Sequence, residues 1–507
     1  MEDLMIVQNE ESSKTNVKKE DLYLLASSVL LGVIFDILFY KKPLGISYPL
    51  FVIAFYLVFL GNLRRKITFK YDFGWFLSIP IMALSSAYFL FSNQIFAVFN
   101  FLIIPILIIA QTILINGENK YKWFDTRFLR DILYGIFNRA FGNTAKPFIV
   151  GLSSMRIRKS NEKHDVVKKV LIGLAISIPL LMIVISLLTA ADQVFKHLID
   201  EVLSSFGSIN LSDFPLQGLL VLLISIIVFS YTWSFLKSNA SVQTQIQQGA
   251  LENNRTIWDP IISITILSLI NCVYLVFILI QFAYMFGAIN NALPPDFTYA
   301  EYARRGFFEL LMVTLINFTL LLSSLKFTKT DGKLAARTVR ILHSLLVLST
   351  MVILSSAFLR MSLYEAAYGY TYLRVLTHSF MIFLFILFVI ALYKIWNEHV
   401  SLLKPYIVIA LMAYLILNFV NIDVLIAKNN IERYIETGKL DTHYLRNLSY
   451  DSIPVLVKLL DEENTPSDLK QYLSEQQSEL AKDQEWQSFN LSRHKAKKAL
   501  TQDNYNN

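Results

Sequence analysis

The sequence predicts an all-α fold, a bundle of about eleven membrane-spanning helices followed by a small helical domain at the C-terminus. Two observations predict it. Apolar residues make up 54% of the 507 residues and charged residues only 17%, which is too little charge for the surface of a soluble protein of this length. The apolar residues are also gathered in long runs, and a helix needs roughly 20 such residues to cross the hydrocarbon core of a bilayer.

Eleven apolar runs are long enough, or nearly so, to cross a membrane. Four fall in residues 21–115, after a polar N-terminal tail of residues 1–20 that does not resemble a cleavable signal, and seven fall in residues 169–421. The run at 257–288 is too long for a straight crossing, so we expect it to tilt, bend or project from the bilayer. The predicted spans are 22–40, 46–62, 73–91, 94–115, 169–190, 214–236, 257–288, 306–325, 338–359, 373–394 and 404–421.

Residues 116–168 form a basic loop that contains a predicted amphipathic helix. In TRFLRDILYGIFNRAF the apolar residues recur at helical spacing on one face and the polar residues fall on the other. This pattern favours a helix lying in the membrane interface, and a loop helix packed on the protein is the alternative. The apolar face comprises Phe128, Leu129, Ile132, Leu133, Ile136, Phe137 and Ala140, and the polar face Arg127, Arg130, Asp131, Asn138 and Arg139.

The character of the chain changes after residue 421. Residues 422–507, here called the tail domain, carry many charges and no apolar run long enough to span a membrane. Helical patterns in VLIAKNNIERYI, SIPVLVKLL and DLKQYLSEQQSELAKDQEW predict that the tail domain is a small, soluble helical unit.

The distribution of lysine and arginine predicts how the chain is oriented, because cytoplasmic loops collect these residues. With the N-terminus inside, internal segments hold 28 of the 46 lysines and arginines, twelve of them in residues 116–169. External loops and span ends hold seven, and the tail domain holds eleven. The sequence therefore predicts a multi-pass protein of the cell membrane with a cytoplasmic N-terminus and an extracytoplasmic tail domain.

In this orientation, unusual polar residues gather at the outer ends of the spans. Ionisable groups at membrane depth are costly unless they are paired or face a wet cavity, which makes them candidates for a site. Glu301, Arg305 and Glu309 recur every four residues and would form one stripe on a helix. The predicted substrate-binding residues are Asp192, Glu301, Arg304, Arg305, Glu309, Arg360, Tyr368, Arg374 and His378, and those predicted to dock the tail domain are Asp423, Lys428, Asn429 and Arg433.

The arginines in this set favour an anionic ligand. The planar guanidinium fork suits phosphate and carboxylate groups, so a groove lined by Arg304, Arg305, Arg360 and Arg374 would bind a small anion or an anionic lipid. The alternative is purely structural. Arg305 would then bridge Glu301 and Glu309, Arg360 would pair with Glu365, the tyrosines around Tyr368 would form an interfacial belt, and His378 would be a hydrogen-bonded core histidine.

Several kinds of chemistry lack their sequence motifs. The chain has no GxxxxGK[ST], HExxH or GxSxG motif, so ATP, zinc and serine hydrolysis have no visible machinery. The single cysteine, Cys272, lies in an apolar run and excludes an intramolecular disulfide and a cysteine metal cluster. We predict no cofactor and no metal site. Basic runs beside the membrane favour the lipid bilayer, rather than nucleic acid, as a partner.

Five sequence blocks resemble a known family. AADQVF, EYARRGFFEL, LYEAAYGYTYLRV, NIDVLIAKNNIERY and EWQSFNLSR are similar, in this order, to signature blocks of a bacterial polytopic membrane family catalogued as domain of unknown function 4173. The blocks spread over roughly residues 185–495. The resemblance implies a bacterial inner-membrane protein with a helical external tail, and it implies no established activity.

Three hypotheses of function follow. The first is a transport protein, a carrier or flippase whose outward-facing cavity binds an anion through the arginines. The second is a non-catalytic sensor or assembly partner in which the polar cluster docks the tail domain and a second protein. The third is a membrane-embedded transferase acting on a lipid-linked substrate with Asp192, Glu301 or Glu309 as base, and the missing catalytic motifs weigh against an enzyme.

Overall fold

The computed structural model of the protein describes residues 18–67, 69–154, 188, 195, 214–238, 258–287, 307–328, 332–397, 399–461 and 466–502. Every regular element within these residues is a helix. Eight of these helices are long and apolar enough to cross a membrane, and a bent pair counted as one span brings the number to nine. The protein is therefore a polytopic helical membrane protein, as its composition and apolar runs predict.

Each predicted span that lies in the described residues corresponds to helix, whereas the predicted span at 169–190 lies outside them apart from residue 188. The predicted span at 257–288 is one continuous helix of 28 residues. The membrane part comprises α1 (Lys19–Phe39), α2 (Ser47–Leu63), α3 (Phe73–Phe76), α4 (Ser78–Leu90), α5 (Gln94–Ile115), α6 (Phe128–Tyr134), the π-helix η1 (Gly135–Arg139), α7 (Lys146–Ser154), α10 (Phe214–Leu236), α11 (Pro260–Gly287), α13 (Phe307–Phe327), α14 (Lys333–Tyr368), α15 (Tyr372–Trp396) and α16 (Leu403–Phe419).

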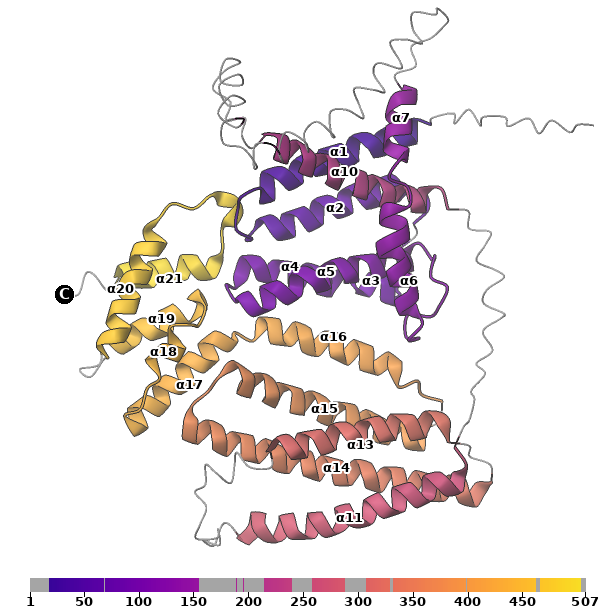
Figure 1. Ribbon diagram of the computed structural model, residues 1–507, viewed down its shortest axis with the longest axis vertical. Coiled ribbons are helices and arrows are strands. Elements are labelled where there is room, and N and C mark those ends of the chain that lie inside the picture. The colour runs from indigo at the N-terminus through magenta and orange to yellow at the C-terminus, as the bar shows by residue number, and fades with distance from the viewer. Residues whose placement is uncertain are drawn as a thin grey trace, which may run out of the picture.

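The spans form two helix bundles (Figure 1). The N-bundle consists of α1, α2, α4, α5 and α10, and the C-bundle consists of α11, α13, α14 and α15. In the C-bundle α14 packs against each of the other three helices, so it forms the centre. Helix α16 lies between the bundles and packs on α4 of the N-bundle and on α15 of the C-bundle.

Each bundle has a loop end and a tail end. At the loop end, ion pairs between Glu20 and Arg65 (2.5 Å) and between Asp21 and Lys237 (2.8 Å) join the start of α1 to the segments that follow α2 and α10. The tail end carries the turns at 40–46, 91–93 and 369–371, and the tail domain covers it (Figure 1). Because α16 begins at the loop end and finishes at the tail end, the tail domain follows it directly.

Helix α14 is much longer than the span predicted at 338–359. It runs for 36 residues, from Lys333 to Tyr368, so Arg360 and Glu365 lie within the helix rather than in a turn. Residues KLAAR at its start favour helix, and at its end Glu365 is buried against a partner on α15, as described below. The helix ends at Gly369, whose φ of +84° requires a residue without a side chain.

The amphipathic segment of the basic loop forms α6 and η1, which cross the loop ends of the spans (Figure 1). The structure divides its faces differently from the sequence prediction. Asp131 is buried with Phe128, because its carboxylate accepts hydrogen bonds from the backbone N–H groups of Lys120 (2.8 Å) and Tyr121 (3.0 Å). Tyr134 is exposed, and so are Leu129, Leu133, Phe137 and Phe141, which form a stripe at every fourth residue that fits lipid contact.

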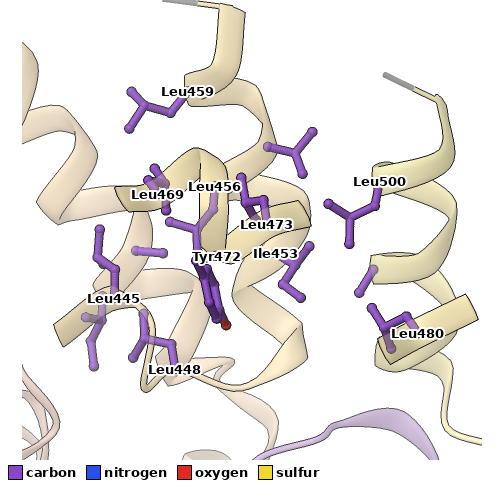
Figure 2. Close-up of a cluster of buried hydrophobic side chains, with 14 of the residues drawn as sticks. Leu445, Leu448, Ile453, Leu456, Leu459, Leu469, Tyr472, Leu473, Leu480 and Leu500 are labelled. Carbon is purple, nitrogen blue, oxygen red and sulfur yellow. The ribbon is translucent and has the colours of Figure 1, made fainter. Parts of the chain in front are cut away.

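The tail domain has a hydrophobic core of its own, shown in Figure 2. Leucines from several short helices surround Tyr472, and this burial raises the pKa of the Tyr472 phenol to about 12. Phe96 of α5 belongs to the same core, so the domain packs directly onto the N-bundle. Its helices are α17 (Ile422–Thr437), α18 (Thr442–Leu445), η4 (Tyr450–Ser452), α19 (Ile453–Leu456), η5 (Val457–Asp461), α20 (Ser467–Ala481), η6 (Trp486–Ser488) and α21 (Leu491–Gln502).

Candidate functional site

The structure places only part of the predicted substrate-binding set. Asp192, Glu301, Arg304 and Arg305 lie outside the described residues. Glu309 lies in the first turn of α13 and is exposed. The remaining four residues lie at the tail end of the C-bundle, Arg360 and Tyr368 on α14 and Arg374 and His378 on α15.

The carboxyl group of Glu365 and the imidazole of His378 form a contact between α14 and α15. Glu365 is only 4% exposed, and its Oε2 lies 3.0 Å from Nδ1 of His378. The other imidazole nitrogen, Nε2, lies 3.2 Å from the Ser362 hydroxyl, and the ring packs edge-on against Phe358. The imidazole therefore has partners on both nitrogens, all of them from α14, which is the arrangement of a histidine that joins two helices.

Arg374 covers the junction where α14 ends. Its guanidinium lies 4.3 Å from the ring centroid of Tyr364, and Nη1 donates a hydrogen bond to the carbonyl of Gly369. Tyr364 in turn contacts the half-exposed ring of Tyr368. The cation is thus shared between a π-face and a backbone carbonyl, with no carboxylate in hydrogen-bond contact among the described residues.

The junction after α14 is also where the tail domain meets the C-bundle. The side chain of Asn430, on α17, pairs with both backbone polar groups of Tyr370: Oδ1 accepts from the N–H and Nδ2 donates to the carbonyl, each at 2.9 Å. A side chain at Gly369 would lie 2.5 Å from Asn430 Oδ1 and 3.4 Å from Arg433 Nε. Asn430 and Arg433 therefore lie directly on the turn, and only glycine leaves room for them.

The other residues predicted to dock the tail domain differ in position. Asp423 is 1% exposed and its carboxylate accepts hydrogen bonds from Asn93 Nδ2 (2.7 Å), at the start of α5, and from the N–H of Ser449 (3.1 Å). Lys428 instead faces solvent, 3.7 Å from Glu432 on its own helix. The side chain of Asn429 makes no hydrogen bond with another described residue. The docking amide is Asn430, one residue further on.

A second buried carboxylate fixes the tail domain to the turn before α5. Asp451 is 7% exposed, and its Oδ2 accepts from the N–H (2.8 Å) and hydroxyl (2.7 Å) of Ser92. Its Oδ1 accepts from Asn421 Nδ2 at 2.9 Å. No arginine or lysine pairs with Asp451 among the described residues, so neutral donors alone satisfy the carboxylate.

The last segment of the tail domain docks on two further turns of the N-bundle. Asn490 Nδ2 donates to the carbonyls of Tyr88 (2.9 Å) and Phe91 (2.7 Å), which the end of α4 leaves without helical partners. Ser488 Oγ donates to the carbonyl of Pro43 (2.8 Å), and the N–H of Ile46 donates to the carbonyl of Phe489 (3.0 Å). These backbone partners carry no sequence signal, so neither Ser488 nor Asn490 is recognisable from the sequence.

A pocket of about 270 Å³ lies between this last segment and the N-bundle. Residues of the tail domain, Tyr450, Asn490 and Arg493 among them, form one side. The other side comes from the turn at 43–44 and from the ends of α4, α5 and α16. Neither Arg360 nor Arg374 lines this pocket, so it is separate from the predicted arginine cluster.

The C-bundle also holds buried polar groups along α14. Asn317 of α13 accepts from the Tyr274 hydroxyl (2.6 Å) and donates to Thr350 Oγ1 (2.9 Å), which ties α11, α13 and α14 together. His343, 2% exposed, lies 2.8 Å from the Ser324 hydroxyl. These groups are hydrogen-bonded to one another, as interhelical polar contacts in membranes are. No group of three potential metal ligands occurs in the part of the chain that the structure describes.

A comparison with protein-family models decides the family. The model described as "Domain of unknown function (DUF4153)" matches residues 78–459, three quarters of the chain. The protein belongs to the DUF4153 family. The family number predicted from the sequence blocks, 4173, was wrong, although the prediction of a family of unknown function is confirmed.

The DUF4153 match covers most of both bundles, α16 and the first half of the tail domain. Glu365, His378, Asp423, Asn430 and Asp451 lie within the match, whereas Asn490 and Arg493 lie beyond it. A search of curated proteins and a search of solved structures each found no match.

Proposed function

We propose that this DUF4153 protein is a non-catalytic membrane sensor or assembly partner whose tail domain clamps two helix bundles together. The observation that carries the proposal is the double docking of the tail domain. Asn430 binds the turn after α14 of the C-bundle, and Asn490 binds the end of α4 of the N-bundle. Between the bundles, helix packing in the described residues runs through α16, and Asn93 Nδ2, at the start of α5, also donates a hydrogen bond to the Tyr372 hydroxyl of α15.

The chemistry of the docking contacts makes the clamp specific. Asp423 and Asp451 are buried carboxylates, and each accepts hydrogen bonds both from the membrane part and from Ser449 of the tail domain. If the domain moved away, each carboxylate would lose its hydrogen-bond donors from the bundle. Water can replace those donors only when the interface opens widely. A partly docked state therefore leaves a buried carboxylate without donors, which costs free energy. The clamp would therefore be either closed or open, which is the behaviour a sensor requires.

We place the tail domain outside the cytoplasm in this proposal. The described lysines and arginines of the loop end include Arg64, Arg65, Arg127, Arg130 and Lys146, whereas the turns of the tail end carry Lys41 and Lys42. This asymmetry supports a cytoplasmic loop end. A clamp outside the cytoplasm would be exposed to external ligands and to a second extracytoplasmic protein.

Spin labels on the two bundles test the clamp. In full-length protein with Cys272→Ser, labels at Lys41→Cys and Ala367→Cys report the distance between the bundles in lipid nanodiscs. We expect a narrow distance distribution, broadened by Asn430→Ala because that variant removes both hydrogen bonds to Tyr370. The matched control is Asn429→Ala, which removes a neighbouring amide without a hydrogen bond to the described residues. A distribution that stays narrow in Asn430→Ala would contradict the proposal.

A carrier or flippase is the second candidate, and the two-bundle arrangement favours it. Rocking of one helix bundle against another is a common transport mechanism. Arg374 and Arg433 lie beside the same glycine at the tail end, where they would attract an anionic lipid or a small anion. Reconstituted vesicles loaded with labelled phosphate, or with a labelled anionic lipid in one leaflet, test it. Movement that Arg374→Gln abolishes supports a carrier, and its absence with both substrates opposes one.

A further inference from the structure

The pocket between the tail domain and the N-bundle has the size of a small-molecule site. Its volume of about 270 Å³ is just below the range of roughly 300–1,000 Å³ for drug-sized ligands, so it suits a smaller molecule. It lies where the turn at 43–44 and the ends of α4, α5 and α16 meet the tail domain. A ligand there would touch two parts of the protein that dock onto each other.

The charged side chain that lines the pocket is positive, and no negative one accompanies it in the lining. This side chain is Arg493, and the lining contains no aspartate or glutamate. Within the described chain the guanidinium of Arg493 makes no hydrogen bond or ion pair, and its contact is the ring of Tyr450, 5.6 Å from the centroid. A half-buried guanidinium beside a cavity, with no counter-ion, leaves its donors available to an anion.

Apart from the exposed side chain of Gln94, the rest of the lining is either apolar or already hydrogen-bonded. Leu44, Phe91 and Ala97 supply apolar surface. Asn100 and Asn418 are bonded to each other at 2.7 Å, and the Tyr414 hydroxyl donates to Asn100 Oδ1 at 2.6 Å. Because these amides are satisfied, the ligand needs few polar groups apart from the one that pairs with Arg493.

We propose that this pocket binds a small amphiphilic anion, with its carboxylate or phosphate head on Arg493 and its apolar part against Leu44, Phe91 and Ala97. The arginine fork accepts either head group in two parallel hydrogen bonds. The pocket lies at the ends of the membrane helices, so the anion could come from solution as a free carboxylate or from the bilayer as a lipid head group. The chemistry that recognises the two sources is the same.

Such a ligand would hold the tail domain onto the N-bundle. A molecule that binds only the docked state stabilises it in proportion to the logarithm of its concentration above Kd. This consequence rests on the clamp proposed above, whereas binding in the pocket does not.

Binding of defined probes to the full-length protein tests the inference. The protein is placed in nanodiscs of neutral phosphatidylcholine, and binding is measured by titration calorimetry. The probes are octanoate and, as a lipid-derived anion, dihexanoyl phosphatidylglycerol. Octanol is the uncharged control for octanoate. Empty nanodiscs correct for partition into lipid. The variants are Arg493→Gln, Arg493→Lys, and Ala97→Leu, which fills the pocket without changing its charge. Lys497→Gln is the control, because Lys497 is exposed on the same helix and does not line the pocket.

We expect saturable binding of at least one anion and none of octanol. Arg493→Gln should weaken binding at least tenfold, Arg493→Lys should restore part of it, Ala97→Leu should abolish it, and Lys497→Gln should leave it unchanged. Binding of octanoate alone identifies a free carboxylate, and binding of the phosphatidylglycerol alone identifies a lipid. The inference is overturned if neither anion binds, if Arg493→Gln binds like the wild type, or if Lys497→Gln loses as much as Arg493→Gln.

The same samples separate the pocket from the clamp. With spin labels at residues 41 and 367, a bound anion should narrow the distance distribution of Asn430→Ala if the clamp is real. Saturable binding that leaves this distribution unchanged keeps the pocket and removes its link to docking. The Ala97→Leu variant keeps the test decisive if Arg493→Gln does not fold, because it leaves every charge in place.

Discussion

At the scale of single residues, the structure depends on buried carboxylates satisfied by neutral donors. Asp131 is the clearest case outside the membrane spans. Burial raises the pKa of its carboxyl group, and the hydrogen bonds from the backbone of Tyr121 and Lys120 oppose this shift only in part. Because the folded state binds the proton more tightly than the unfolded state, ionisation of Asp131 costs stability as the pH rises through the raised pKa.

Two substitutions at Asp131 should therefore differ. Asn keeps an oxygen for both N–H groups and does not titrate, so Asp131→Asn should be at least as stable as the wild type at pH 7. This advantage should shrink as the pH falls toward the unfolded carboxyl value of about 3.9. Asp131→Ala leaves two N–H groups unpaired and should lose roughly 1–3 kcal/mol at every pH. Thermal unfolding in detergent between pH 4 and 8 measures both substitutions. If the stability of the wild type relative to Asp131→Asn increased as the pH rose, the argument would be refuted.

The residue scale is also where sequence prediction reached its limit. The sequence places Asp423 and Arg433 near the tail end, and both lie there, on α17. Asn429 and Asn430 are adjacent amides with the same local pattern, and nothing in the sequence decides which one faces Tyr370. That choice depends on the rotation of α17 about its axis, which the three-dimensional packing sets.

At the scale of elements, glycines at both ends of α14 give a matched test of docking. Gly332 and Gly369 have φ values of +98° and +84°. A side chain at Gly332 would meet nothing within 4 Å, whereas one at Gly369 would collide with Asn430. Alanine at either position should destabilise the protein by about 1–3 kcal/mol through backbone strain. Only Gly369→Ala should also displace the tail domain, because only there does the new side chain collide with Asn430.

We expect Gly369→Ala to lower the melting temperature more than Gly332→Ala does. It should also speed proteolysis within α17, because the loss of the Asn430 contact frees that helix from the C-bundle. Limited proteolysis with mass spectrometry, beside thermal unfolding, measures the difference. Equal effects of the two substitutions on α17 would show that the turn at 369–371 does not hold the tail domain.

The helix boundaries show which features of the fold the sequence predicts and which it does not. The apolar runs predict the described spans because burial in lipid demands about 20 apolar residues per crossing. The C-terminal end of α14 was not predicted because the polar residues Arg360 and Glu365 lie beyond the apolar run at 338–359. The contact of Glu365 with His378 offsets the cost of burying the Glu365 carboxyl group within the longer helix. The faces of α6 were not predicted because the carboxylate of Asp131 is buried against backbone N–H groups of Lys120 and Tyr121, which belong to a different segment.

At the scale of the whole molecule, the question is whether the two docking sites act as one. Asn490 caps α21 by accepting from the N–H of Arg493 (3.0 Å) and also donates to the carbonyls of Tyr88 and Phe91. Asn490→Asp keeps the capping oxygen and removes the donor, so α21 should stay helical while the contact with α4 is lost. Two hydrogen bonds and a new oxygen–oxygen repulsion make that loss roughly 2–3 kcal/mol.

If the tail domain is a rigid clamp, losing its contact with the N-bundle must also weaken its contact with the C-bundle. Hydrogen exchange, followed by mass spectrometry, should then speed up in Asn490→Asp both near residues 86–93 and near residues 369–376, although Asn490 makes no hydrogen bond to the second segment. A loss of 2–3 kcal/mol corresponds to at least tenfold faster exchange wherever opening of the whole interface controls it. Faster exchange confined to residues 86–93 would mean two independent contacts, and the tail domain would then be a cover on each bundle rather than a clamp across both.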